Sequence, residues 1–298
     1  MKILLLGKNG MLGSQFKKQF DGFGENFEIT ALDRDELDVT DEDALSQVFV
    51  ELSPDIVINC TGYTAVDEAE SHREEAFNLN ANAPRKIAQL CDKNGAVLIH
   101  FSTDYVFDGQ KDVETGGYDE ESTPNPLSVY GESKLKGEEF IQSEMTRYFI
   151  IRTSWLYGPR PSTSSGGHIS GGNFVDTMLR LGKEVLSGDR DRVRVVGDQF
   201  GSPTYTVDLV RAVIHGFFIG WPDKIPAFGI YHLTGDGVCS WHEFAVQIFE
   251  LAGLKVAVEK ISTSEYKTEA RRPKNSMLTN TKLPKMSRWE KALEAYHA

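Results

Sequence analysis

The sequence is poor in cysteine and in positive charge. Its 298 residues include three cysteines, Cys60, Cys91 and Cys239, which lie far apart and form no CxxC pair. This usage argues against a disulfide framework and favours reduced thiols, so we expect a cytoplasmic protein. The formal net charge of −12 argues against a nucleic-acid partner and against binding to an anionic membrane surface.

Long apolar runs and several catalytic signatures are also missing. No apolar stretch is long enough to span a bilayer, so we expect no membrane partner. The run Ile3–Leu6 after Lys2 is too short for a signal peptide and reads as a buried strand. The seven histidines form no H-E-x-x-H motif, and no G-x-S-x-G motif occurs. We therefore expect no metal site and find no support for a serine hydrolase.

What the chain does contain is a repeated alternation of strand and helix patterns. Apolar segments that predict strands are separated by helical patterns, and five such alternations occur in the first half of the chain. The expected strands cover residues 3–6, 28–33, 54–60, 96–101 and 148–152. This order predicts an α/β fold with a Rossmann-type, doubly wound parallel sheet.

The pattern loosens after residue 158. We expect a dinucleotide-binding domain over 1–158 and a smaller C-terminal substrate domain over most of 159–298. Further strands are expected at residues 193–196 and 229–233, and elements near 193–220 are expected to return to the first domain. In residues 159–172, eleven of fourteen positions are Ser, Thr, Gly or Pro, which predicts a mobile loop that closes over a substrate.

A glycine-rich turn follows the first expected strand. Gly7, Gly10 and Gly13 form a G-x-x-G-x-x-G motif between a strand and a helix. Such a turn lets backbone N–H groups approach a pyrophosphate at the helix N-terminus. Asp33 lies twenty residues further on, where an acid meets the adenosine ribose, whereas neighbouring Arg34 suits a 2′-phosphate. The choice between NAD and NADP therefore stays open at this point.

Tyr130 and Lys134 form the second signal. Pro124 and Pro126 precede them, so a helix is expected to begin just after these prolines. On that helix the two side chains share one face, and a lysine ammonium there is expected to lower the pKa of the tyrosine. The alternative is a surface tyrosine and lysine that share a face by chance.

The third signal is Thr103. This residue follows the fourth expected strand, so it is expected in the same crevice as the glycine-rich turn.

The three signals together resemble the extended short-chain dehydrogenase/reductases. Longer phrases narrow the resemblance to the dTDP-4-dehydrorhamnose reductase family, and it extends from the first strand to about Leu278. The phrases are Thr64–Glu70, Ser102–Gly109, Arg152–Gly158 and Arg272–Ser276.

The resemblance implies a reaction and a set of site residues. It implies reduction of the C4 ketone of a nucleotide sugar, dTDP-4-dehydro-L-rhamnose, to dTDP-L-rhamnose with NADPH or NADH, and it allows a homodimer. It implies a catalytic set of Thr103, Tyr130 and Lys134, with Asn80 supporting the lysine through water. The implied cofactor contacts are Gly7, Gly10, Met11, Leu12, Gly13, Asp33, Arg34, Asp38, Val39, Thr61, Gly62, Tyr63, Ser102, Tyr130 and Lys134. The implied substrate contacts are Thr103, Asp104, Tyr105 and Trp155.

The chain departs from the family pattern at two places. Thr61-Gly62-Tyr63 stands where the family commonly has Ala-Ala-His, and Gln15 stands where some members have a metal-binding glutamate. No metal is therefore carried over. Two other functions stay open: another nucleotide-sugar reductase or epimerase of the superfamily, or a non-catalytic regulatory subunit resembling that of methionine adenosyltransferase. Trp155 also stays open as an ordinary core aromatic.

Overall fold

The computed structural model describes residues 1–22, 27–159, 173–219 and 224–297. Of the loop expected at 159–172, all but Pro159 lies outside the described residues, so its closure stays a prediction. Within the described ranges, no helix combines the length and the apolar character needed to cross a membrane.

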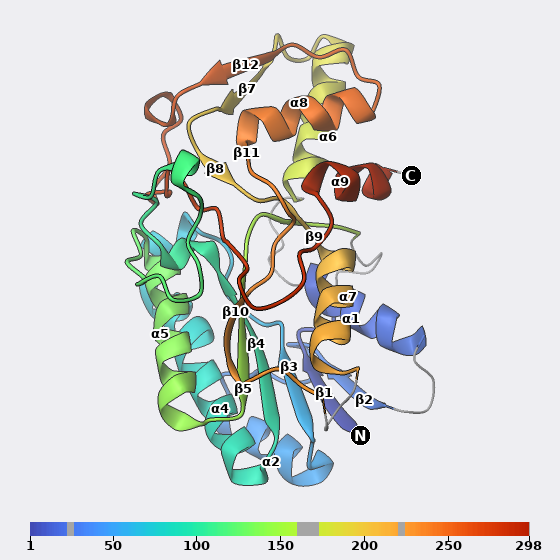
Figure 1. The fold of residues 1–298 in the computed structure, drawn as a ribbon, viewed down its shortest axis with the longest axis vertical. Coiled ribbons are helices and arrows are strands. Elements are labelled where there is room, and N and C mark those ends of the chain that lie inside the picture. The colour runs from blue at the N-terminus through green and yellow to red at the C-terminus, as the bar shows by residue number, and fades with distance from the viewer. Residues whose placement is uncertain (23–26, 160–172, 220–223, 298) are drawn as a thin grey trace.

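A six-stranded sheet forms the centre of the molecule (Figure 1). Its order is β10-β5-β4-β3-β1-β2, and every neighbouring pair is parallel. The chain leaves β1 in both directions, towards β2 on one side and towards β3, β4 and β5 on the other. This topology confirms the predicted doubly wound α/β fold. The strands are β1 (Lys2–Leu6), β2 (Glu28–Leu32), β3 (Ile56–Asn59), β4 (Val97–Thr103), β5 (Tyr148–Thr153) and β10 (Gly229–His232).

Helices cover both faces of this sheet. Helices α1 (Met11–Phe20) and α7 (Thr206–Phe217) pack on one face, over a core that includes Phe16 and Phe149. The other face is covered by α2 (Glu42–Leu52), α4 (Ala83–Asn94) and α5 (Val129–Glu144). Burial on both faces explains why the sequence of β1 after Lys2, and most of the sequence of β3 and β4, is apolar.

A second core lies above the sheet in Figure 1. It contains Tyr157, Phe244 and Trp289. Its elements are α6 (Phe174–Ser187), α8 (Trp241–Leu251), α9 (Trp289–His297), β7 (Val193–Val196) and β12 (Val258–Ile261). Short pairs connect it to the rest: β6 (Leu156–Tyr157) with β9 (Thr204–Tyr205), and β8 (Phe200–Gly201) with β11 (Cys239–Ser240). The chain crosses between the two cores more than once, because α7 and β10 lie after α6 in the sequence but pack with the six-stranded sheet. The domain boundary expected at residue 158 stays a prediction.

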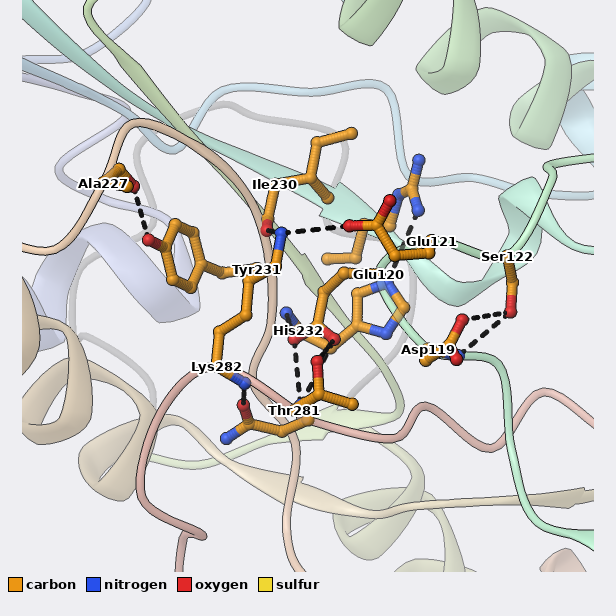
Figure 2. Close-up of polar contacts among 12 residues, drawn as sticks. Asp119, Glu120, Glu121, Ser122, Ala227, Ile230, Tyr231, His232, Thr281 and Lys282 are labelled. Atoms are coloured by element: carbon orange, nitrogen blue, oxygen red, sulfur yellow. Dashed lines mark hydrogen bonds and ion pairs between the residues drawn. The ribbon is translucent and has the colours of Figure 1, made fainter.

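The C-terminal segment is tied to the sheet by polar contacts (Figure 2). The carboxylate of Glu120 accepts from the backbone N–H of His232 at 3.2 Å and from the hydroxyl of Thr281 at 2.7 Å. Lys282 Nζ donates to the carbonyl of Ile230 at 3.1 Å. These contacts join the loop before α5, strand β10 and the segment around residue 281, so residues far apart in sequence are fixed against one edge strand.

Candidate functional site

The carboxyl edge of the sheet brings the expected site residues together. Leu6 pairs with Asn59, and Thr103 pairs with Thr153, so the loops after β1, β3, β4 and β5 begin at the same edge. In a doubly wound sheet, this edge is where ligands bind.

The glycine-rich turn fits a dinucleotide phosphate. Gly7 follows β1 with φ +84°, a left-handed conformation that favours glycine, and a Cβ at Gly13 would collide with the Gly7 carbonyl. Gly10 is the N-cap of α1, where it has no side chain to occupy the first N–H groups of the helix. Met11 and Leu12 form the first turn. The helix therefore presents free N–H donors and a positive dipole end to an anion.

Asp33 ties the end of β2 to the glycine turn. Its Oδ2 accepts from the backbone N–H of Asn9 at 2.7 Å, and its Oδ1 accepts from that of Arg34 at 2.8 Å. Arg34 has an exposed side chain beside Asp38, with 3.9 Å between Nε and Oδ2. Asp38 accepts from Thr40, and these hydrogen bonds lower the pKa of the Asp38 carboxyl.

Lys8 is a cation of this region that sequence reasoning missed. Its ammonium lies 2.6 Å from the carboxylate of Glu36, which follows β2. The hydrogen bond from Lys8 lowers the pKa of Glu36. The signal that could have found Lys8 is its place inside the glycine-rich turn. Val39, which was expected near the cofactor, has a buried side chain.

The loop after β3 is held by two asparagines. Asn59 Oδ1 accepts from the backbone N–H of Thr61 at 3.0 Å and from its hydroxyl at 2.6 Å. Asn80 Oδ1 accepts from the N–H of Tyr63 at 2.8 Å, and its Nδ2 donates to the Tyr63 carbonyl at 3.0 Å. A Cβ at Gly62 would lie 3.2 Å from Asn80 Oδ1. The departure from the family pattern at 61–63 thus gives a loop that packs tightly on Asn80.

Asn80 also reaches the helix that carries the tyrosine. It lies in a π-helical turn, Asn78–Asn82, between α3 (Arg73–Phe77) and α4. Such turns are frequent at functional sites because they re-aim side chains. Asn80 Nδ2 lies 3.0 Å from the hydroxyl of Ser133, the neighbour of Lys134.

Helix α5 begins close to where the prolines predict. Ser128 is its N-cap and accepts from the N–H of Gly131 at 3.2 Å. Tyr130 therefore lies in the first turn, and its ring packs edge-on against Tyr105 with 5.6 Å between ring centroids. A Cβ at Gly131 would collide with the Tyr105 carbonyl, so glycine there allows the helix to approach the loop after β4.

Thr103 and Tyr130 form the hydroxyl pair of the site. Burial raises the pKa of Tyr130 to about 12, while a hydrogen bond with the Thr103 side chain acts in the opposite direction. Thr103 is itself fixed, because its hydroxyl donates to Asp104 Oδ1 at 3.0 Å and accepts from the N–H of Tyr105. Ser102, just before it, donates to the buried carboxylate of Glu138.

Lys134 is buried below this pair. Its Nζ donates to the Phe101 carbonyl at 2.6 Å and lies 3.4 Å from His100 Nε2. Burial lowers the pKa of Lys134 to about 8, opposed by the charge of Glu138. The expectation that Lys134 lowers the pKa of Tyr130 is wrong for this arrangement: the Lys134 nitrogen donates to a backbone carbonyl, and burial dominates at the tyrosine and raises its pKa.

The buried position of Asp104 disfavours the charged form of its carboxyl group. Its side chain is 2% exposed, and burial raises its pKa to about 6. Oδ1 accepts from Thr103, whereas Oδ2 has no partner with hydrogen-bond geometry among the described residues. Ser276 lies near enough to lower the pKa somewhat. A buried oxygen without a good partner is destabilising, and such groups are frequent at functional sites.

Trp155 has both faces of its indole covered. It is in the left-handed region with φ +46°, a strained conformation for this residue. Trp241, the first residue of α8, stacks on it with 3.4 Å between ring centroids and 5° between planes. A Cβ at Gly201 would meet Cε2 most closely, then Nε1 and Cζ2, which places Gly201 over the other face. Only the edges of the Trp155 indole are therefore left for a sugar.

Sequence reasoning missed Trp241. An aromatic at the first helical position, inside the capping box of Ser240 and Glu243, looks like an ordinary core residue, and its stacking on Trp155 depends on tertiary packing that the sequence does not contain. As for metals, the described part of the chain contains no group of three or more His, Cys, Asp or Glu side chains placed to hold an ion. The expectation of no metal stays a prediction.

The fold and the site fit an oxidoreductase of the extended short-chain dehydrogenase/reductase class. The family model described as RmlD substrate binding domain matches residues 1–298. The chain belongs to the dTDP-4-dehydrorhamnose reductase family.

Individual relatives agree with this assignment. The chain is 36% identical over 311 residues to the dTDP-4-dehydrorhamnose reductase of Aggregatibacter actinomycetemcomitans, covering 100% of this chain and 98% of that protein. It matches the crystal structure of the Bacillus anthracis str. Ames reductase in complex with NADP with a TM-score of 0.86 and 38% identity, over 99% and 98% of the two chains. A UDP-glucose 4-epimerase of Thermotoga maritima, at 19% identity and a TM-score of 0.76 over 100% and 97%, shares the fold alone.

Proposed function

We propose that this chain reduces the C4 ketone of dTDP-4-dehydro-L-rhamnose to dTDP-L-rhamnose with NADPH or NADH. The observation that carries the proposal is the placement of Thr103, at the end of β4, beside Tyr130, whose helix also carries the buried Lys134. The pair lies at the same sheet edge as the glycine-rich turn.

The residues have distinct roles in this proposal. A reduced nicotinamide cofactor supplies a hydride when bound. In the complex, the Thr103 hydroxyl turns its proton from Asp104 to the substrate carbonyl oxygen and polarises it, and Tyr130 donates a proton to the alkoxide that develops there. Donors aimed at developing charge are usually a large catalytic term. Because burial raises the pKa of Tyr130 to about 12, the tyrosine is protonated at neutral pH and serves as the acid.

The cofactor is held by groups already in place. The first turn of α1, at Gly10, Met11 and Leu12, binds the pyrophosphate, and Lys134 holds the nicotinamide ribose. Asp33 accepts from the adenosine ribose, while Lys8 and Arg34 lie on the same side and favour a 2′-phosphate. This mixture of charges supports use of both NADPH and NADH.

The nucleotide sugar lies on the opposite side of Tyr130. We assign its contacts to Thr103, Asp104, Tyr105 and the edge of Trp155, with Trp241 as the added aromatic surface. We further propose a cytoplasmic protein, in line with its three unpaired cysteines, and a homodimer as its assembly.

Turnover with a panel of 4-keto nucleotide sugars tests the function. NADPH oxidation should be fastest with dTDP-4-dehydro-L-rhamnose, with stoichiometric dTDP-L-rhamnose as product. An epimerase would interconvert sugars without net oxidation of NADPH. A regulatory subunit would oxidise no NADPH with any sugar of the panel. Either result would remove the proposal.

A further inference from the structure

The nitrogen of Lys134 lies against a histidine that has no role in the proposed reaction. His100 is on β4, and its side chain is 0% exposed. Its Nε2 lies 3.4 Å from Lys134 Nζ, and its Nδ1 lies 3.1 Å from the side-chain amide nitrogen of Asn59. Asn59 is also fully buried. The three side chains form a continuous polar row inside the sheet.

The orientation of the Asn59 amide follows from its other partner. The backbone N–H of Thr61 points at one terminal atom of Asn59 at 3.0 Å, and the Thr61 hydroxyl lies 2.6 Å from the same atom. A backbone N–H can only donate, so this atom must be the oxygen. The Nδ2 group of Asn59 therefore faces His100 Nδ1 and donates to it.

The protonation of His100 follows in turn. Burial holds the pKa of His100 well below its ordinary value, and the nearby charge of Lys134 acts in the same direction, so the ring is neutral. A neutral imidazole has one N–H and one acceptor nitrogen. Because Nδ1 accepts from Asn59, the N–H is on Nε2 and points at Lys134 Nζ. An ammonium has no lone pair to accept it, whereas a neutral amine does.

We propose that Asn59 and His100 form a buried pair that presents an N–H group to the nitrogen of Lys134, and that His100 is thereby a positioning residue that favours the neutral amine form of this lysine. This inference rests on the proposed function, because Lys134 is the catalytic lysine there. It gives the reductase a lysine that exchanges its proton near neutral pH.

The other groups that face Lys134 do not explain this preference. Glu138, one turn further along α5, favours the ammonium but is already paired with Arg152 at 2.6 Å. Cys60, after β3, would favour the ammonium only as a thiolate, and burial raises the pKa of its thiol far above neutrality. Tyr130, on the same helix, is a neutral phenol. Desolvation and the His100 N–H therefore act together against the charged form.

Histidine tautomers measured by long-range ¹H–¹⁵N NMR test the pair without any turnover. In the ¹⁵N-histidine-labelled protein, His100 should show the Nε2–H tautomer, and its signal is identified by its loss in His100→Met. His232 is an internal reference of opposite kind, because its Nδ1 donates to the Tyr118 carbonyl at 3.0 Å and its Nε2 faces Arg152. A His100 ring that is Nδ1-protonated, or doubly protonated, at pH 7 would overturn the proposal.

The pH dependence of kcat tests the consequence for Lys134. In His100→Met the N–H donor is gone, so the basic limb of the profile should move upward by about one pH unit. Asn59→Asp keeps an oxygen for Thr61 and places a second one at His100 Nδ1, which reverses the tautomer and should move the limb the same way. A loss of kcat at all pH values with an unmoved limb would indicate a merely structural histidine and contradict the role.

The two measurements separate this inference from the proposed function. If the chain were not a reductase, no turnover would be seen, but the tautomer of His100 in the wild-type protein would still be as stated. If His100→Met failed to fold, the switch of one signal from Nε2–H to Nδ1–H in Asn59→Asp would identify His100, and the absence of any such switch would refute the pair.

Discussion

Asp104 is a residue whose charge is unfavourable to the folded state. Burial raises its pKa from 3.8 to about 6, so the folded protein binds this proton more tightly than the unfolded chain. The stabilisation that follows is fully present below about pH 4 and is lost as the pH rises through 6. Asp104→Asn should therefore raise the free energy of unfolding at pH 7 by up to about 3 kcal/mol, with little difference below pH 4.

Urea denaturation at pH 4 and pH 7 measures this difference. Asp108→Asn is the matched control, because hydrogen bonds from Tyr118 and Asn125 outweigh burial and lower the pKa of Asp108. Asp108→Asn should therefore lower the free energy of unfolding at pH 7, which is the opposite of the change expected for Asp104→Asn. An Asp104→Asn protein that gained nothing between pH 4 and pH 7 would show that the carboxyl is not strained.

Gly201 sets the position of the Trp155 indole. Gly201→Ala places a methyl group against Cε2 of that ring and should push the two indoles out of their stack, as overpacking does. We expect a weaker near-ultraviolet circular dichroism signal and a KM for the nucleotide sugar raised about tenfold, with the KM for NADPH unchanged. Gly22→Ala is the control, since a Cβ there meets nothing within 4 Å. Unchanged dichroism and KM would refute the stacking role.

Some of these residues could be predicted from the sequence and others could not, for physical reasons. Tyr130 and Lys134 were visible because a helix places residues four apart on one face. Asn59 and His100 come together only through the register of β3 on β4, which pairs them directly, and a single sequence does not contain that register. Whether Lys134 acts on Tyr130 also depends on side-chain rotamers, and in the structure the Lys134 nitrogen donates to the Phe101 carbonyl instead.

Strand β5 and helix α5 are joined by a buried ion pair. Arg152 and Glu138 have side chains 2% and 0% exposed, and Nη2 lies 2.6 Å from Oε2. Removing one partner leaves an uncompensated buried charge. Arg152→Met should therefore lower the free energy of unfolding by about 3–5 kcal/mol, and adding Glu138→Gln should restore part of it.

A double-mutant cycle by urea denaturation measures the coupling. The control is Arg211→Met, which removes an exposed partner of Asp208 and should change stability by less than about 1 kcal/mol. Equal losses for Arg152→Met and Arg211→Met would contradict a stabilising role for the buried pair.

Elements were predicted best where their signals are local. The strands of the first half were placed to within about two residues at each end, because buried parallel strands are short apolar runs between turn signals. The strand at 229–232 was expected, but not its place beside β5, because nothing local tells an edge strand which neighbour it joins. The strand at 193–196 was likewise expected, whereas its pairing with β12 depends on chain more than sixty residues away.

In the whole molecule, the proposed active site lies between the sheet and the second core. The six-stranded sheet and its helices supply the glycine turn, Thr103, Tyr130 and Lys134, and the second core supplies Trp241. Both must be correctly packed for turnover, so changes that unfold either should abolish activity. The central claim is narrower: the Tyr130 hydroxyl is the acid of a carbonyl reduction.

The most direct test is turnover by Tyr130→Phe with NADPH and dTDP-4-dehydro-L-rhamnose. The substitution keeps the ring against Tyr105 and removes only the proton donor. Because general acid catalysis is typically worth about 10²–10⁴-fold, kcat should fall by at least about a hundredfold. Circular dichroism and the dissociation constant of NADPH should stay close to wild type. Near-normal turnover by the folded variant would contradict the account.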